Sequence, residues 1–214
     1  LVLVTEDAER TMATHLGVAN SFAPGDVDGH LLERTKVTYL EGYLFDLPPA
    51  KEAMREAVAA THGAEGSVAL SLSDSFCVDR HRNDFLELLN GDVDLLFANK
   101  DEILSLFSAK SLDLALGALE ETGVLGAVTL GAEGCVIVTP AGRISIEAAA
   151  IDKVVDTNGA GDLFAAGFLY GITNGLDPEA SGRLAGLCAS EVISHLGARP
   201  QADLRKLAEA AGLL

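Results

Sequence analysis

The segment Val154–Tyr170 has the sequence VVDTNGAGDLFAAGFLY and decides the fold class of this chain. We predict that a β-run ends at Val155, that the glycines turn the chain, and that an apolar helix runs from Ala160 to Tyr170. Ligands of open α/β sheets bind in loops that join the carboxyl end of a strand to the next helix. The loop between the predicted strand and helix is therefore the first candidate site.

The rest of the chain repeats this alternation of short apolar runs and helical patterns. Such alternation is typical of a mainly parallel sheet with helices on both faces. We therefore predict an α/β fold, a three-layer α/β/α sandwich with a mainly parallel central sheet, formed by a single domain over residues 1–214. The predicted strands are Leu1–Thr5, Val37–Leu40, Val68–Leu72, Val93–Phe97, Gly126–Leu130 and Cys135–Val138, with a tight turn at Gly131–Gly134. The other predicted helices are Ala50–Thr61, Asp84–Leu89, Lys100–Phe107, Leu112–Glu121, Pro178–Leu196 and Leu204–Ala211.

The composition argues against several classes of protein. The chain has 32 Asp and Glu against 15 Lys and Arg, and this excess of negative charge repels nucleic acids and anionic membrane surfaces. No apolar run reaches the roughly 18 residues that a membrane span needs. The cysteines Cys77, Cys135 and Cys188 form no CxxC pair, so neither a disulfide framework nor a zinc site is expected. We therefore expect a cytoplasmic protein with neither a nucleic-acid nor a membrane partner.

The loop Asp156–Asp162 has two features of an anion-binding site. N–H groups in the first turn of a helix have no partner within the helix, and the helix dipole places about half a positive charge there. The small residues Gly159, Ala160 and Gly161 would let a phosphate approach these N–H groups. Asp162 follows at once; its charged form is stabilised at a helix start, and it could orient a hydroxyl toward the phosphate. The alternative is that Asp162 only caps the helix and the glycines only form the bend.

Four motifs, in the right order, resemble the ribokinase (PfkB) family of carbohydrate and nucleoside kinases. DTNGAGD at 156–162 is similar to the second signature of the family, and NKDE at 99–102 is similar to its NxxE motif. TLGAEG at 129–134 resembles its nucleotide segment, and Gly197–Ala198 resembles its closing Gly-Ala element. Each motif is weak alone, but four together in this order are specific.

The resemblance implies an ATP-dependent phosphotransferase. Asp162 would be the catalytic base, and Gly159–Gly161 would form the anion hole. Asn99 and Glu102 would organise Mg²⁺ and phosphate through water, which suits an ion that keeps much of its hydration shell. The alternative for this pair is a capping box at a helix start.

The resemblance also assigns residues to the nucleotide and to a second cation. Relatives often carry Asn near the position of Gly186, and this chain lacks it. Some members bind a monovalent cation such as K⁺ through backbone carbonyls at positions that match Asp156 and Asn158. The residues assigned to the nucleotide are Asn99, Glu102, Thr129, Gly131, Gly134, Asn158 and Gly186.

A basic cluster of Arg80, His81 and Arg82 follows a predicted strand. We predict that these residues belong to a solvated loop. The alternative is that they reach the phosphates of ATP.

The amino-terminal third of the family has no counterpart in this sequence. That region supplies a Gly-Gly motif, an acidic residue that grips the acceptor hydroxyls, and a β-lid. Residues 1–20 would be a remnant of the lid-bearing region, and residues 1–214 alone would bind nucleotide at best, with very weak turnover. Family members are often dimers through the lid, so the resemblance also implies a homodimer of the full-length protein.

The acceptor is predicted to be a nucleoside or a sugar. Asp156–Gly159 and Tyr39–Leu44 resemble adenosine-kinase-type members, so adenosine is the first prediction, and a sugar of the ribose or fructose type is the alternative. A rival from another class is a non-catalytic sensor that binds a nucleotide or sugar on a kinase scaffold. The presence of Asp162 counts against a sensor, because a protein that only binds its ligand needs no base.

Overall fold

The computed structural model describes residues 1–8 and 10–214, and these form two compact units. The sheet unit comprises Leu16–Leu130 and Val136–Ile144. The helical unit comprises Leu1–His15, Gly131–Cys135 and Ser145–Leu214.

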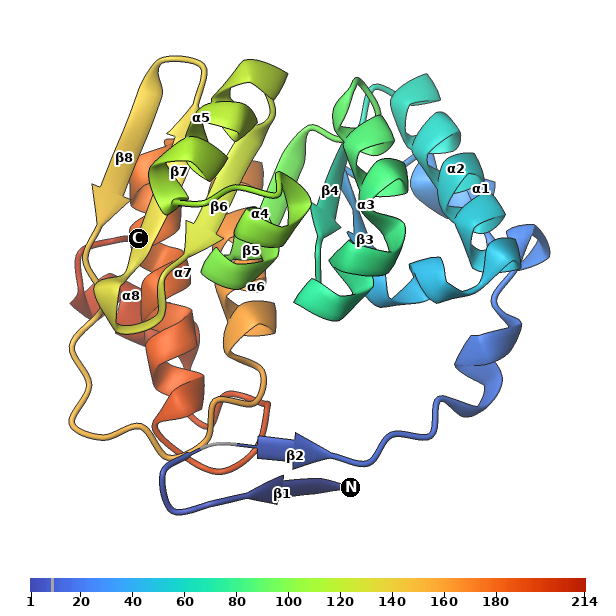
Figure 1. The fold of residues 1–214 in the computed structure, drawn as a ribbon. Helices are drawn as coiled ribbons and strands as arrows, with labels where there is room; N and C mark the ends of the chain where they lie inside the picture. The colour runs from blue at the N-terminus through green and yellow to red at the C-terminus, as the bar shows by residue number, and fades with distance from the viewer. Residues whose placement is uncertain (9) are drawn as a thin grey trace. The chain divides into compact units, whose positions relative to one another are not determined.

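The sheet unit is built on a six-stranded sheet with the strand order β3-β4-β5-β6-β7-β8 (Figure 1). The first four strands are parallel, as predicted. Very short connections join β6 to β7 and β7 to β8, and neighbouring strands joined so closely run antiparallel. The strands are β3 Val37–Glu41, β4 Ser67–Ser71, β5 Leu95–Asn99, β6 Leu125–Thr129, β7 Cys135–Thr139 and β8 Gly142–Ile146.

The helices that connect the parallel strands cover one face of this sheet. Because β3 to β6 lie side by side in chain order, right-handed crossovers place all their connecting helices on the same face, as Figure 1 shows. Buried side chains of these helices, such as Phe85, Ile103 and Leu119, join those of the strands in one apolar core. The helices of this unit are α1 Gly29–Leu32, α2 Pro48–Gly63, α3 Ser75–Leu89, α4 Lys100–Leu106 and α5 Leu112–Thr122, with 3₁₀ turns at Gly17–Ser21, Pro24–Asp26 and Gly42–Asp46.

The helical unit contains a close helix pair and a small sheet. A Cβ atom on Gly167 would lie 2.8 Å from Ala185 Cα, and one on Gly171 would lie 2.5 Å from Ser181 Oγ, so glycine lets α6 and α7 approach closely. The antiparallel strands β1 and β2 pair Val4 with Arg10. The elements are β1 Val2–Val4, β2 Arg10–Met12, a 3₁₀ turn at Gly131–Glu133, α6 Ala160–Thr173, α7 Pro178–Ile193 and α8 Leu204–Ala210.

Three local predictions were wrong. The strand expected to end at Val155 does not form. The N–H group of Val155 instead donates to Ile193 O at 2.8 Å. Strand β8 was not predicted, because Gly142–Ile146 is short and alternates with polar residues. Helix α3 begins at Ser75 rather than at Asp84, because Asp74 accepts hydrogen bonds from the N–H groups of Phe76 and Cys77 and caps the helix.

This early start of α3 also corrects the prediction of a solvated basic loop. Arg80, His81 and Arg82 lie in the helix, which has a kink at His81 (φ −121°, ψ 22°). Arg80 donates two hydrogen bonds to the Asp46 carboxylate, at 3.0 and 2.8 Å, and Arg82 pairs with Asp79 at 2.7 Å. These cations are therefore engaged within the sheet unit, and nothing in their contacts supports the alternative role at ATP phosphates.

The α/β class and the mainly parallel sheet are confirmed, and β1 confirms the strand expected at Leu1–Thr5. Across residues 1–8 and 10–214, no helix is long and apolar enough to cross a membrane.

Candidate active site

The loop before α6 has the backbone that an anion hole requires. Gly159 is the N-cap of the helix and has a left-handed conformation with φ 82°, which favours glycine. A Cβ atom at this position would lie 2.9 Å from three atoms of Ala198, so a side chain is excluded by packing as well. Gly161 differs, since a Cβ there would meet nothing within 4 Å. The surface in front of Gly161 is open within the helical unit.

The four N–H groups from Gly159 to Asp162 divide into one that makes a hydrogen bond and three that do not. Ala160 N–H donates to Thr157 O at 3.3 Å, so it contributes less to an anion hole than predicted. Within the described part of the chain, the N–H groups of Gly159, Gly161 and Asp162 make no hydrogen bond. Three N–H donors at a helix start without partners favour an anion.

Asp162 lies in the first turn of α6, and its side chain is exposed. No hydrogen bond or ion pair among the described residues engages its carboxylate, and no side-chain cap is formed at this helix start. The alternative prediction, in which Asp162 serves as a cap, is therefore not supported. The carboxylate is free to accept a hydrogen bond from a ligand hydroxyl.

Asp156 fixes the loop through hydrogen bonds of its side chain, a role that the sequence did not predict. Its side chain is 3% exposed, and its two oxygens accept from Asn158 N–H and Gly197 N–H, each at 2.9 Å. These two hydrogen bonds keep the pKa of the carboxyl below its usual value. The loop is also held by Arg10, which donates to Thr157 Oγ1 at 2.7 Å. The only signal in the sequence was the Asp-x-Asn spacing, which is typical of a side chain that accepts from the N–H two residues on.

Asn99 and Glu102 form the capping box that was the alternative prediction for this pair. Asn99 Oδ1 accepts from Glu102 N–H at 2.9 Å, and Glu102 Oε2 accepts from Asn99 N–H at 2.8 Å. A third hydrogen bond runs from Asn99 Nδ2 to Glu102 Oε1 at 2.8 Å. Burial raises the pKa of Glu102 to about 7, with smaller contributions from the nearby carboxylates of Asp74, Asp101 and Glu41.

The fit of this pair to Mg²⁺ can be judged from these hydrogen bonds. Both oxygens of Glu102 already accept one hydrogen bond each, and the side chain is only 6% exposed. A carboxylate oxygen has a second lone pair, which can accept from a metal-bound water. Contact through water therefore fits the geometry better than direct coordination.

Polar side chains gather where the parallel strands of the sheet unit end, and part of this set was missed. Asn99 and Thr129 are register partners at the ends of β5 and β6. Beyond β4, Ser73 donates to Glu41 Oε2 at 2.8 Å, and Ser73 has a left-handed φ of 67° that is unusual for a residue with a side chain. Tyr43 donates to the carbonyl of Ser73 at 2.8 Å. Glu41 and Ser73 follow predicted strands, and that position was the available signal.

The predicted nucleotide glycines differ in their surroundings. At Gly134 both the left-handed backbone (φ +89°) and the close approach of Ile146 O to the position of a Cβ require glycine. Gly131 and Gly186 have no atom within 4 Å of the position of a Cβ. Their surfaces are open to a ligand within the helical unit.

One group of side chains in the described residues has the composition of a metal site. Ligand atoms of Asp46, Cys77 and His81 lie within 4.8 Å of one another. Burial raises the pKa of Cys77 to about 11, and Arg80 and Lys51 already place positive charge beside Asp46 and His81. Cys77 Sγ also donates to Gly42 O at 3.1 Å, and Asp46 pairs with both Arg80 and His81, so all three side chains already have partners within the sheet unit.

Comparison with known proteins decides the family. The family model described as pfkB family carbohydrate kinase matches residues 1–204. The chain belongs to the pfkB family. This membership confirms the resemblance found in the four sequence motifs.

Solved structures agree with this assignment. A probable sugar kinase from Rhizobium etli has a TM-score of 0.97 at 44% identity, with 100% of this chain and 65% of that chain covered. The adenosine kinase from Sinorhizobium meliloti has a TM-score of 0.95 at 46% identity, with 98% and 64% covered. A protein from E. coli described as a ribokinase II, in complex with ATP and Mg²⁺, has a TM-score of 0.85 at 18% identity, with 95% and 68% covered. The last likeness concerns the fold alone, and together the three confirm the predicted ribokinase-like α/β fold.

The chain thus spans 65% and 64% of the two more similar relatives. One of those relatives is described as a sugar kinase and the other as an adenosine kinase, so the comparisons do not choose between the two acceptor classes. What the comparisons establish for this chain is a pfkB-family kinase fold.

Proposed function

We propose that this chain is the phosphoryl-transferring part of an ATP-dependent kinase that phosphorylates a hydroxyl group of a nucleoside, with adenosine as the first candidate. The observation that carries the proposal is the start of α6, where three N–H groups without partners lie beside the exposed carboxylate of Asp162. Charge on a transferring phosphoryl group is stabilised by such donors, which are in place before the reaction begins.

The proposed reaction transfers the γ-phosphoryl group of ATP to the acceptor hydroxyl. The acceptor oxygen forms a bond to the γ-phosphorus of ATP, and the bond from that phosphorus to the bridging oxygen breaks, so that ADP leaves with the electron pair. The hydroxyl proton passes to a carboxylate oxygen of Asp162. Meanwhile the N–H groups of Gly159 and Gly161 hold the oxygens of the moving phosphoryl group. Because the transition state is loose, Asp162 mainly has to orient the hydroxyl.

Other residues are proposed to bind and organise the nucleotide. Mg²⁺, when bound, neutralises phosphate charge, and Asn99 and Glu102 would hold it through water. The nucleotide would be lined by Thr129, Gly131 and the α7 surface at Gly186. The position of Thr129 at the end of β6 supports its role, and the open space at Gly131 and Gly186 supports theirs. Backbone carbonyls of Asp156 and Asn158 are proposed to bind K⁺.

The decisive experiment replaces Asp162 by Asn in the complete gene product and measures phosphate transfer from ATP. Loss of a general base lowers kcat by roughly 100-fold to 10,000-fold. Asp152→Asn is the control, because Asp152 is also an exposed aspartate of the helical unit and lies outside the α6 turn. Equal rates for wild type and Asp162→Asn would refute the role of Asp162. Nucleotide binding without any transfer by wild type would favour the sensor.

The acceptor is identified by a thermal-shift panel of nucleosides and sugars with a non-hydrolysable ATP analogue. A ligand that binds only the folded state stabilises it by about 2.7 kcal/mol at a hundredfold excess over Kd. We expect adenosine to raise the Tm. The adenosine kinase from S. meliloti supports this choice, whereas the sugar kinase from R. etli supports the alternative. A response to ribose or fructose without a response to adenosine would move the assignment to a sugar kinase.

A further inference from the structure

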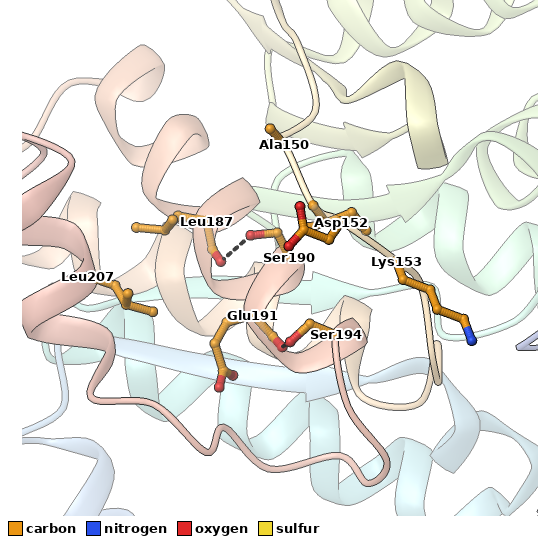
Figure 2. Close-up of a pocket in the computed structure, with 9 residues that line it drawn as sticks. Ala150, Asp152, Lys153, Leu187, Ser190, Glu191, Ser194 and Leu207 are labelled. Carbon is orange, nitrogen blue, oxygen red and sulfur yellow. Dashed lines mark hydrogen bonds between the residues drawn. The ribbon is translucent and has the colours of Figure 1, made fainter.

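Glu191, near the end of α7, has a buried carboxylate that the proposed mechanism does not use. Its side chain is 8% exposed, and its Oε1 accepts from the N–H groups of Gln201 and Ala202, each at 2.8 Å. His195 Nε2 lies 3.3 Å from the same oxygen. Figure 2 shows this side chain directed away from Asp152, which lines the same surface depression. The carboxylate therefore serves the chain segment that follows α7.

That segment supports the α6 turn. Gly197 N–H donates to Asp156 Oδ2 at 2.9 Å, and Ala198 fills the space beside Gly159 where a Cβ would stand. The carbonyl of Ile193 accepts from the N–H of Val155 at 2.8 Å. Residues 193–202 are thus bound to the anion-hole loop at one end and to Glu191 at the other.

Oε1 of Glu191 is the single acceptor for two consecutive backbone N–H groups, a role that an apolar packing contact cannot replace. The second oxygen of Glu191, Oε2, is buried and has no hydrogen-bond partner among the described residues. The side chain therefore acts through Oε1 alone, and its removal would leave Gln201 N–H and Ala202 N–H without an acceptor.

We infer that Glu191 is a positioning residue for phosphoryl transfer, which fixes residues 193–202 and through them the N–H groups at the start of α6. The inference rests on the proposed function. It predicts an effect on the chemical step rather than on ligand binding, because small displacements of reacting groups are costly to rate.

The test compares Glu191→Ala, Glu191→Gln and Glu179→Ala in the complete gene product. Glu179 lies on the same helix and forms an exposed pair with Arg183, so its loss is the matched control. We expect Glu191→Ala to lower kcat by roughly tenfold to a hundredfold, with little change in the KM values for ATP and acceptor. Glu191→Gln keeps a carbonyl acceptor and should restore most of the rate.

Hydrogen exchange of residues 155–163, measured by mass spectrometry, gives a readout that is independent of turnover. Faster exchange in Glu191→Ala than in Glu179→Ala is expected. Unchanged exchange, or a kcat equal to that of the control, would overturn the inference. So would a loss of kcat in Glu191→Ala that Glu191→Gln fails to restore. If Glu191→Ala does not fold, Glu191→Asp, which withdraws the carboxylate by one methylene, must show the same faster exchange. Absence of phosphate transfer by wild type would instead refute the proposed function, and the exchange result would still decide whether Glu191 fixes the start of α6.

Discussion

Helices α4 and α6 begin in the same way in sequence but differ in structure. Each follows an N-cap residue, Asn99 or Gly159, and each carries an acidic residue at its third position, Glu102 or Asp162. In α4 the N-cap side chain and Glu102 satisfy each other, and the carboxylate is buried. In α6 the N-cap has no side chain, the N–H groups of Gly161 and Asp162 make no hydrogen bond among the described residues, and Asp162 is exposed. A closed helix start stabilises the fold, whereas an open one can bind a ligand.

The largest expected effect concerns the buried carboxylate of the closed helix start. Since the pKa of Glu102 is raised from 4.5 to about 7, the folded state binds more protons than the unfolded state between these values. The contribution of Glu102 to the free energy of unfolding is therefore full below pH 4.5 and is lost as the pH rises to about 7. For a pKa shift of this size, that contribution is about 3 kcal/mol. Urea unfolding of wild type and Glu102→Gln between pH 4.5 and 7 measures this contribution, because the variant has no carboxyl group at position 102 to titrate.

The carboxyl groups with lowered pKa values, such as Asp156, act in a different window. They lose their stabilising effect only as the pH falls below about 4. The two contributions therefore separate. Parallel pH profiles for wild type and Glu102→Gln between pH 4.5 and 7 would contradict the burial argument.

The next effect concerns the backbone of the open helix start. Gly159→Ala introduces a side chain at φ 82° and against Ala198, so it should destabilise the fold by about 1–3 kcal/mol and lower kcat. Gly175→Ala is the control, since Gly175 has φ +87° but nothing within 4 Å of its Cβ position. Urea unfolding of both variants separates the cost of the dihedral angle from that of the contact. If the two variants lose the same free energy of unfolding, Ala198 moves aside at little cost and the contact does not destabilise Gly159→Ala.

A smaller effect is expected when the closed start loses its cap. Asn99→Ala removes an N-cap, worth about 1 kcal/mol, and also removes one donor from a buried carboxylate. Ser111→Ala removes an ordinary cap from α5, where the Oγ accepts from Leu114 N–H at 3.4 Å. Thermal unfolding should show a greater loss for Asn99→Ala. A loss no larger than that of Ser111→Ala would show that the Nδ2 hydrogen bond to Glu102 contributes little.

The smallest effect on stability is expected at Gly161, and it should be favourable. Alanine is preferred over glycine inside a helix by about 0.5–1 kcal/mol, and a Cβ on Gly161 would meet nothing within 4 Å. Gly161→Ala should therefore raise the Tm slightly while it weakens the use of ATP, because a phosphate must approach this backbone. Gly117→Ala in α5 should affect the Tm alone. Unchanged kinetics in Gly161→Ala would remove that residue from the anion hole.

Much of this molecule follows from local pattern. The spacing of apolar residues predicted α2, α4, α5, α6 and α7, and the short apolar runs predicted the four parallel strands. Two of the errors have different causes. Val155 forms no strand because its N–H group bonds to Ile193, which is distant in sequence. Helix α3 begins early because Asp74 caps it, and this is a local signal that the prediction did not use.

The sequence by itself determined the family and the position of the α6 turn, because four ordered motifs carried the first and the Gly-rich spacing before an apolar helix carried the second. Only the tertiary structure decided which acidic residue is buried and which is open. Glu102 is buried and hydrogen-bonded to its own N-cap residue, whereas Asp162 is exposed on a loop that Asp156 and residues 193–202 hold in place. These supporting contacts join residues about 40 positions apart, and no local pattern encodes them.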